Sequence, residues 1–161
     1  MAARIARAGV SSATLYRRWP TKHDLVAAAI ASLHHEIVDV DTGSLETDIA
    51  AVVRSVADAM AVRRDDVAEQ VAVALRHNPE FSAAVREKFI VPRQAVLHRI
   101  LDQARRRGEL GPGLSATVAM SFVSGPLHHR VYVLGEPLTP AFLRSTVAAA
   151  LAALRALAPA S

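Results

Sequence analysis

The turn-forming residues of this 161-residue chain fall at helix-length intervals, and this spacing restricts the fold more than any other feature. The segments between them are rich in Ala, Leu, Val and Arg, and none alternates apolar and polar residues as a half-buried strand does. Helices are expected over residues 2–8, 11–19, 20–39, 44–63, 65–77, 80–107, 115–134 and 139–157. Pro92 should kink or break the sixth of these helices. The sequence therefore predicts an all-α fold.

The excess positive charge of the chain is confined to its first thirty residues. They hold five basic side chains and one acidic one, whereas the rest of the chain holds fourteen of each. A basic segment on a neutral body is typical of a phosphate-binding head attached to a ligand-binding or dimerisation domain. The alternative is chance clustering of charge in a short window. Short helices precede long ones, so we assign residues 1–40 to a head with its connecting helix and residues 41–161 to a helical body.

Several classes of site are disfavoured by the residue types present. Without cysteine the chain can form no disulfide, thiol nucleophile or thiolate metal site. His34-His35 and His128-His129 are adjacent pairs, and neighbours on a helix point about 100° apart rather than at one ion. No nucleophile elbow, phosphate loop or dinucleotide fingerprint occurs, and no acid, base and nucleophile converge. We therefore expect neither an enzyme nor a metal or cofactor site.

One stretch, residues 110–129, contains no Asp, Glu, Lys or Arg and so requires a check for a membrane span. It is interrupted by Gly111, Pro112, Gly113, Gly125 and Pro126. We interpret it as a core helix preceded by a loop. The N-terminus is a basic amphipathic helix rather than a signal peptide. A soluble, cytoplasmic protein with no membrane partner is expected.

Residues 6–22 have the pattern of two helices joined by a tight turn. Gly9 supplies the permissive backbone for the bend. Ser11 is a good N-cap, with Val10 and Leu15 placed to form a hydrophobic staple around it. The outward residues offer small, hydroxyl and basic groups suited to base edges and phosphates, and they are Ser12, Ala13, Thr14, Tyr16, Arg17, Arg18 and Lys22. The alternative is an ordinary surface corner with its arginines in solvent.

This segment resembles the DNA-binding signature of tetracycline-repressor-like regulators. The matching pattern is Gly9-Val10-Ser11-x-x-Thr14-Leu15-Tyr16-x-x-Trp19-Pro20-x-Lys22-x-x-Leu25. The second half is similar to a regulatory domain of that family through Pro79-Glu80-Phe81, Pro92-Arg93, Arg107-Gly108-Glu109-Leu110, Gly125-Pro126-Leu127-His128-His129-Arg130 and Gly135-Glu136-Pro137-Leu138. The resemblance implies a homodimer that binds palindromic operator DNA and is released by a small ligand. It also implies a three-helix head, whose first helix would precede residue 1 and leave the head incomplete here.

The function expected from this resemblance is that of a ligand-responsive transcriptional regulator, in particular a repressor. Base contacts are expected from Ser12, Ala13 and Arg17, and backbone contacts from Thr14, Tyr16 and Lys22, while Arg18 suits either role. The alternative is a dimeric small-ligand-binding protein of the same lineage that no longer binds DNA because its head is truncated. The alternative is supported by the missing helix and by Ile5, where the family usually has a small residue.

Two further sites are expected in the body. A pocket for an unknown small-molecule effector would be lined by Phe81, Phe89, Met120, Phe122 and His128. Plain core packing is the alternative for these residues. A dimer interface would use the last two helices through Gly125, Leu143, Val147, Leu151 and Leu154. Here the alternative is that these helices close the core of their own chain.

The run from Arg105 to Arg107 precedes Gly108 at the expected end of a helix. We expect these side chains to compensate the helix dipole there. A second phosphate-binding patch is the less favoured interpretation.

Overall fold

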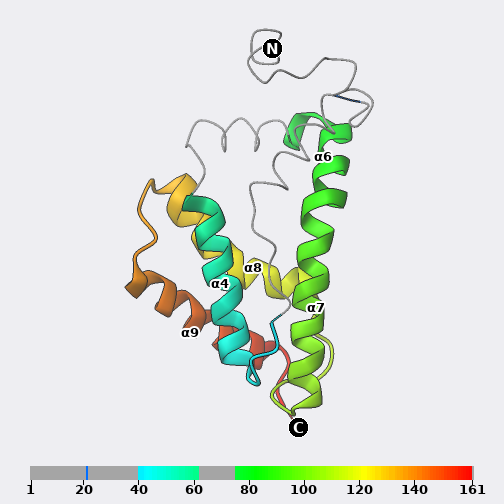
Figure 1. The fold of residues 1–161 in the computed structure, drawn as a ribbon, viewed down its shortest axis with the longest axis vertical. Helices are drawn as coiled ribbons and strands as arrows, with labels where there is room; N and C mark the ends of the chain where they lie inside the picture. Colours follow the sequence, from blue (N-terminus) through cyan, green and yellow to red (C-terminus); the bar gives the residue numbers. More distant parts are fainter. Residues whose placement is uncertain (1–20, 22–39, 62–74, 161) are drawn as a thin grey trace, which may run out of the picture.

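The computed structural model describes residues 21, 40–61 and 75–160, and within these ranges every regular element is helical. The elements are α4 (Leu45–Ala61), α6 (Pro79–Val85), η1 (Arg86–Ile90), α7 (Val91–Arg106), α8 (Ala116–His128), η2 (His129–Val133) and α9 (Pro140–Leu157). Figure 1 shows α4 between α9 and α7, with α8 crossing them. Of these helices, α4, α8 and α9 pack against one another, and α7 packs against α4 and α8.

The main core lies between the apolar faces of these four helices. In α4 the buried residues recur three or four positions apart, as in an amphipathic helix, and they include Leu45, Ile49, Val52 and Val56. The main contributions of the other helices are Leu97, Ile100 and Leu101 from α7, Ala119, Val123 and Leu127 from α8, and Ala150, Leu151 and Leu154 from α9. A second, smaller cluster forms around Phe81 and Val85 of α6. The continuous helix from α6 through α7 therefore contributes to two separate clusters.

Side-chain caps determine where three helices begin. The side chains of Asn78, Ser115 and Thr139 each accept a hydrogen bond from the backbone N–H three residues further on, at 3.0, 3.2 and 3.2 Å. Each bond satisfies one of the donors that a helix leaves unpaired at its N-terminus. Ser115 and Thr139 stand where the sequence placed the starts of the last two helices, so those two starts are confirmed.

Two prolines occur within the long helices, and each is accompanied by a π turn. Neither Pro92 nor Pro126 has an N–H to donate to the helical ladder. η1 precedes the first, and the N–H of Val91 bonds to the carbonyl five residues back. η2 follows the second, and the N–H of Leu134 bonds back in the same way. The kink or break predicted at Pro92 is thus a wider turn within one continuous helix.

One arginine holds the loop between η2 and α9. Arg130 Nε donates to the carbonyl of Pro137 at 2.9 Å, and the guanidinium pairs with Glu136 at 2.9 Å. The same group lies 4.4 Å over the ring of Phe142. Gly135 adopts a φ of +66°, which favours glycine. In this loop Gly135 allows the turn, while the side chain of Glu136 and the carbonyl of Pro137 bind Arg130.

By length and composition alone, α9 is apolar enough to cross a membrane. The core helix of a globular domain meets the same criterion. Ala150, Leu151 and Leu154 of α9 lie in the main core. We therefore describe α9 as a helix with one face in the core of its own chain and its other faces exposed.

Candidate functional site

The residues predicted to contact DNA belong to the N-terminal segment. All of them lie outside the described residues, and they are Ser12, Ala13, Thr14, Tyr16, Arg17, Arg18 and Lys22. Their roles stay predictions. The boundary between head and body, placed at residue 40, also stays a prediction. The structure does describe residues 40–44, the segment that leads into α4.

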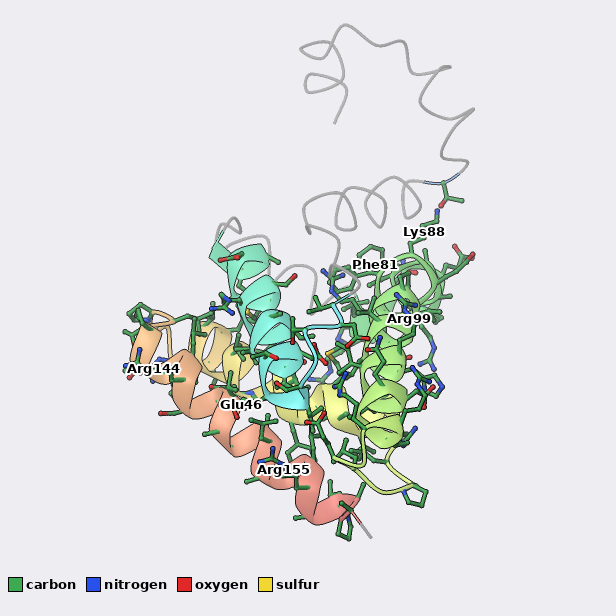
Figure 2. All side chains as sticks on the ribbon, turned by 60° about the horizontal axis from the view of Figure 1, so that its bottom comes forward. Glu46, Phe81, Lys88, Arg99, Arg144 and Arg155 are labelled. Carbon is green, nitrogen blue, oxygen red and sulfur yellow. The ribbon has the colours of Figure 1, made fainter. Side chains whose placement is uncertain are left out.

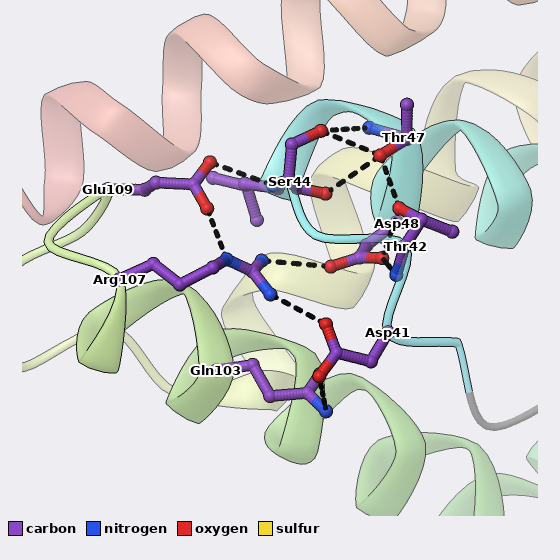
Figure 3. A network of polar contacts seen from close by, with 9 residues as sticks. Asp41, Thr42, Ser44, Thr47, Asp48, Gln103, Arg107 and Glu109 are labelled. Carbon is purple, nitrogen blue, oxygen red and sulfur yellow. Dashed lines mark hydrogen bonds and ion pairs between the residues drawn. The ribbon is translucent and has the colours of Figure 1, made fainter.

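The entry to the body is fixed by a network of polar side chains around Arg107, at the C-terminal end of α7 (Figure 3). The guanidinium pairs with Asp41 at 2.8 Å, with Asp48 at 3.0 Å and with Glu109 at 2.5 Å. Asp41 and Asp48 precede it in the sequence by 66 and 59 residues. One side chain thus joins the segment that enters the body, the first turns of α4 and the loop after α7.

Asp48 is fully buried, and both of its carboxylate oxygens have partners. Oδ2 accepts from Arg107 at 3.0 Å. Oδ1 accepts from the backbone N–H of Thr42 at 2.8 Å and from its hydroxyl at 2.7 Å. A carboxylate is stable in a protein interior only with such compensation. The burial of Asp48 therefore depends on Arg107 and on the turn at residues 41–44.

Glu109 caps α4 from a distant part of the chain. Its Oε2 accepts from the N–H of Leu45 at 2.8 Å, which is one of the unpaired donors of the first turn. Burial by itself would raise the pKa of Glu109, but the hydrogen bonds from Arg107 and Leu45 and the charge of Arg107 lower that pKa overall. The pKa of Arg107 is raised, mainly because its side chain donates a hydrogen bond to Glu109.

The run from Arg105 to Arg107 forms specific ion pairs and hydrogen bonds in addition to any effect on the helix dipole. Arg107 forms the three ion pairs given above, and Arg105 pairs with Asp102 at 2.7 Å and donates to the carbonyl of Leu114 at 2.6 Å. Arg106 is exposed. Two of the three side chains therefore have specific partners within the body. No local sequence pattern indicates the partners of Arg107, because Asp41 and Asp48 precede it by 66 and 59 residues.

The residues predicted to line an effector pocket are divided between different parts of the body. Phe81 is buried in the small cluster at α6, and Phe89 packs against it. Met120 packs against the main core. Phe122 is 40% exposed on α8, and His128 is exposed with its Nδ1 2.7 Å from a carbonyl one turn back. The structure brings Phe81 and Phe89 together but not the other three, and a pocket common to all five stays a prediction.

The predicted dimer residues are mostly turned toward the core of their own chain. Leu154 is fully buried and Leu151 is 5% exposed, while Leu143 and Val147 are half-buried against the same core. A partner could not reach Leu154 in this arrangement. Leu151 and Leu154 are thus covered by their own chain and Leu143 and Val147 only partly, and a dimer interface through these residues stays a prediction.

Gly125 differs from the other four because it is exposed on α8. A Cβ added to it would meet nothing within 4 Å. Val118 and Phe122 on the same helix are 43% and 40% exposed, whereas Ala119, Val123 and Leu127 are buried. α8 therefore has one face in the core and one apolar face left open in the single chain.

Comparison with known proteins gives two profile matches. Residues 39–150 match the family described as "Tetracyclin repressor-like, C-terminal domain". Residues 3–29 match the family described as "Bacterial regulatory proteins, tetR family". The two matches cover most of the chain.

Curated relatives and a solved structure are similar over most of the chain. An uncharacterized HTH-type transcriptional regulator of Bacillus subtilis, YdeS, is 26% identical over 142 residues, which are 88% of this chain and 72% of that protein. An uncharacterized HTH-type transcriptional regulator of Mycobacterium tuberculosis is 30% identical over 135 residues, 83% of this chain and 66% of that protein. A DNA-binding transcriptional repressor TetR of Mycobacteroides abscessus is 30% identical over 142 residues, with coverages of 86% and 73%.

The crystal structure of a TetR family transcription regulator superposes with a TM-score of 0.70 at 25% identity, and it covers 92% of this chain and 84% of that one. The chain spans about two thirds to three quarters of the length of the three curated relatives. The predicted all-helical fold, with an N-terminal helix-turn-helix region and a C-terminal helical domain, is confirmed.

Proposed function

Since the chain belongs to the tetR family of bacterial regulatory proteins, we propose that it is a ligand-responsive repressor that binds palindromic operator DNA as a homodimer in the cytoplasm. As a member of that family it is a helix-turn-helix transcriptional regulator and not an enzyme. The observation that carries the proposal is the combination, in one chain, of the matched segment 3–29 with the matched C-terminal domain 39–150. The repressor named among the relatives supports the direction of regulation.

The network around Arg107 supplies a physical link between the two parts in this proposal. Asp41 lies at the predicted boundary, and its ion pair with Arg107 attaches that boundary to the end of α7. A ligand that displaces the end of α7 relative to α4 disturbs the ion pairs of Arg107 with Asp41 and Asp48 together, and so shifts the segment at this boundary. In a dimer, such a movement changes the distance between two recognition helices and so the fit to one turn of DNA.

The open face of α8 supports the dimer. Val118, Phe122 and Gly125 leave apolar surface and a close-approach position uncovered in the single chain. Exposed apolar surface next to a small residue suits an isologous interface, in which the same face of both copies meets. The interface proposed here uses α8 rather than the buried stripe of α9.

DNA binding by the whole chain is the test of the proposed function. Selection from a random duplex pool should enrich a palindrome, and affinity for it should fall steeply with salt, because Lys and Arg release counterions from phosphates. Lys22→Ala should weaken operator and random DNA alike and reduce the salt slope by about one. Arg17→Ala should cost about 1–3 kcal/mol on the operator and relax its sequence preference.

The matched control for these variants is Arg106→Ala, which removes one exposed arginine from the body. It should leave the selected sequence and its affinity nearly unchanged. Equal losses on operator and random DNA from Arg17→Ala would reject its assignment to bases. A folded dimer that enriches no sequence would instead favour the small-ligand-binding protein that no longer binds DNA.

A charge on the open face of α8 should separate the two subunits. Phe122→Arg places a cation on the proposed apolar interface, where it would be buried without a partner. Light scattering at micromolar concentration should give the mass of a dimer for the wild type and that of a monomer for the variant. Circular dichroism should show the same helix content for both.

Val91→Arg is the control for this substitution, because Val91 is an apolar residue that is 48% exposed at the start of α7 and does not belong to the open face of α8. The Val91 variant should keep the mass of a dimer. A monomeric wild type would exclude the dimer, and a dimeric Phe122→Arg variant would exclude this face as the interface.

A further inference from the structure

A groove runs between α4 and α9 on the surface of the body and uses none of the residues assigned to the effector pocket. It has a volume of about 870 Å³, and all of its lining residues come from these two helices. On α9 they recur three or four positions apart, so the groove follows one face of that helix. From Arg144 to Arg155 the helix rises by about 16 Å. The groove is therefore long and open rather than a closed cavity.

The floor of the groove is apolar. Val53 of α4 and Leu151 of α9 are buried beneath it, and Leu143 and Val147 are half-buried beside them. Ala148 is exposed within the groove, and its small side chain leaves the floor uncovered. Such a surface favours an apolar occupant, because its coverage removes apolar area from water.

The rim of the groove carries an unbalanced positive charge. Its charged residues are Arg54, Arg144, Arg155 and Glu46, which leave a net charge of +2. Figure 2 shows Arg144 and Arg155 toward the two ends of α9, with Glu46 on the neighbouring α4. Within residues 40–61 and 75–160, no ion pair or hydrogen bond involves the side chains of these three arginines.

Within the described part of the chain, the rim arginines share the lack of a partner with the exposed Arg86 and Arg106, and the apolar floor beneath them is what distinguishes them from those two. Arg105, Arg107 and Arg130 each bind an acidic side chain. Arg105 and Arg130 also donate to a backbone carbonyl. The rim arginines have exposed side chains above an apolar floor and no such partners among the described residues. Guanidinium groups bind carboxylates through two parallel hydrogen bonds. Positive rim and apolar floor together fit a ligand that has an anionic end and an apolar body.

We propose that this groove binds an amphipathic carboxylate, an unbranched apolar chain with one acidic end group of the medium-chain fatty acid type. The apolar chain lies along the floor beside Val147 and Leu151, and the carboxylate binds a rim guanidinium. A cationic amphiphile is repelled by the same rim, and an uncharged one leaves the arginines unused. The inference is drawn from α4 and α9 alone and stands whether or not the chain binds operator DNA.

Calorimetric titration of the full chain with dodecanoate, below its micelle-forming concentration, tests the proposal. Dodecanoate should bind with one site per chain, and dodecanol of the same chain length should bind about tenfold more weakly, as expected for the loss of a charged hydrogen bond. The Arg144→Gln/Arg155→Gln variant should lose about tenfold in affinity for dodecanoate. The Arg86→Gln/Arg106→Gln variant removes the same charge at two exposed positions outside the groove and should bind as the wild type does.

A steric variant tests the position of the ligand. Ala148→Phe fills the groove from an exposed position, so it should abolish dodecanoate binding while the free energy of unfolding stays the same. The proposal is overturned if the wild type binds no dodecanoate, if dodecanol binds equally well, or if both arginine pairs lose affinity equally. Unchanged binding by Ala148→Phe overturns it as well. Conversion of a dimer to a monomer by that variant, with no dodecanoate bound by the wild type, would instead show that a second copy covers the groove.

Discussion

Replacement of Arg107 by Met should lower the free energy of unfolding by about 3 kcal/mol, the loss expected when one partner of a buried ion pair is removed. The variant leaves the fully buried Asp48 without its cation, and Glu109 loses the partner that orients it toward the first turn of α4. Met keeps most of the apolar side-chain volume, so the loss reports charge rather than packing. Urea unfolding followed by circular dichroism measures the difference.

Arg106→Met is the matched control, since Arg106 is the exposed neighbour in the same helix. It should change the free energy of unfolding by less than about 0.5 kcal/mol. Asp48→Asn combined with Arg107→Met should lose less than the two single variants summed, because the double variant leaves no buried charge unpaired. Equal losses from Arg107→Met and Arg106→Met would show that the network contributes no stability.

The difference in the free energy of unfolding between the wild type and Arg107→Met should become smaller as the pH falls. Contacts that lower the pKa of Glu109 in the folded chain add stability above the ordinary pKa of a glutamate. That stability is lost as the pH falls through the lowered value. Arg107 is a main source of the lowering, so the gap between the wild type and Arg107→Met should narrow on acidification. A gap that stays constant between neutral and acidic pH would contradict this assignment.

Replacement of Gly111 by Ala should lower the free energy of unfolding by about 2 kcal/mol, within the range for overpacking of a buried site. The N–H of Gly111 donates to the carbonyl of Ala158 at 2.9 Å, which brings the end of α9 against the loop before α8. A Cβ at this position would lie 2.2 Å from the carbonyl oxygen of Pro159, and both contacts belong to backbone. The backbone at Pro159 or the loop at Gly111 must therefore shift, which strains the contact between the chain after α9 and this loop.

Pro112→Ala is the control, since Pro112 is the exposed next residue of the same loop. It should cost less than about 1 kcal/mol, through greater freedom of the unfolded chain. Amide hydrogen exchange separates the two variants, because only Gly111→Ala should accelerate exchange in the last turn of α9. Equal stability and equal exchange in both variants would reject the close approach as a stabilising contact.

Local features of the sequence predicted the helical body well. Ser115 and Thr139 were placed correctly as helix starts because a cap bonds to the backbone only three residues away. Pro92 was placed correctly as a disturbance because its missing N–H acts within one turn. The form of the disturbance, a π turn, depends on how the flanking helix packs, and the sequence alone did not predict it.

Features that depend on distant residues were not predicted. The helical spacing of Leu151 and Leu154 indicates a buried face, but it cannot say whether a second subunit or α4 and α8 of the same chain cover that face. The partners of Arg107 follow from the packing of α7 beside the start of α4, which no local pattern encodes. The groove was missed for the same reason, since Ala148 is informative only next to α4.

The capping of α4 by Glu109 has a consequence for the order in which the chain is made and folds. Ribosomes deliver α4 first, whereas the carboxylate that caps Leu45 follows 64 residues later. α9, which packs along the same helix, follows later still. Until Arg107 has been synthesised the buried Asp48 has no cation, and until α9 has been synthesised the apolar face of α4 has no complete cover. The packing around α4 therefore cannot be completed before α9 has been synthesised, long after the residues matched to the helix-turn-helix.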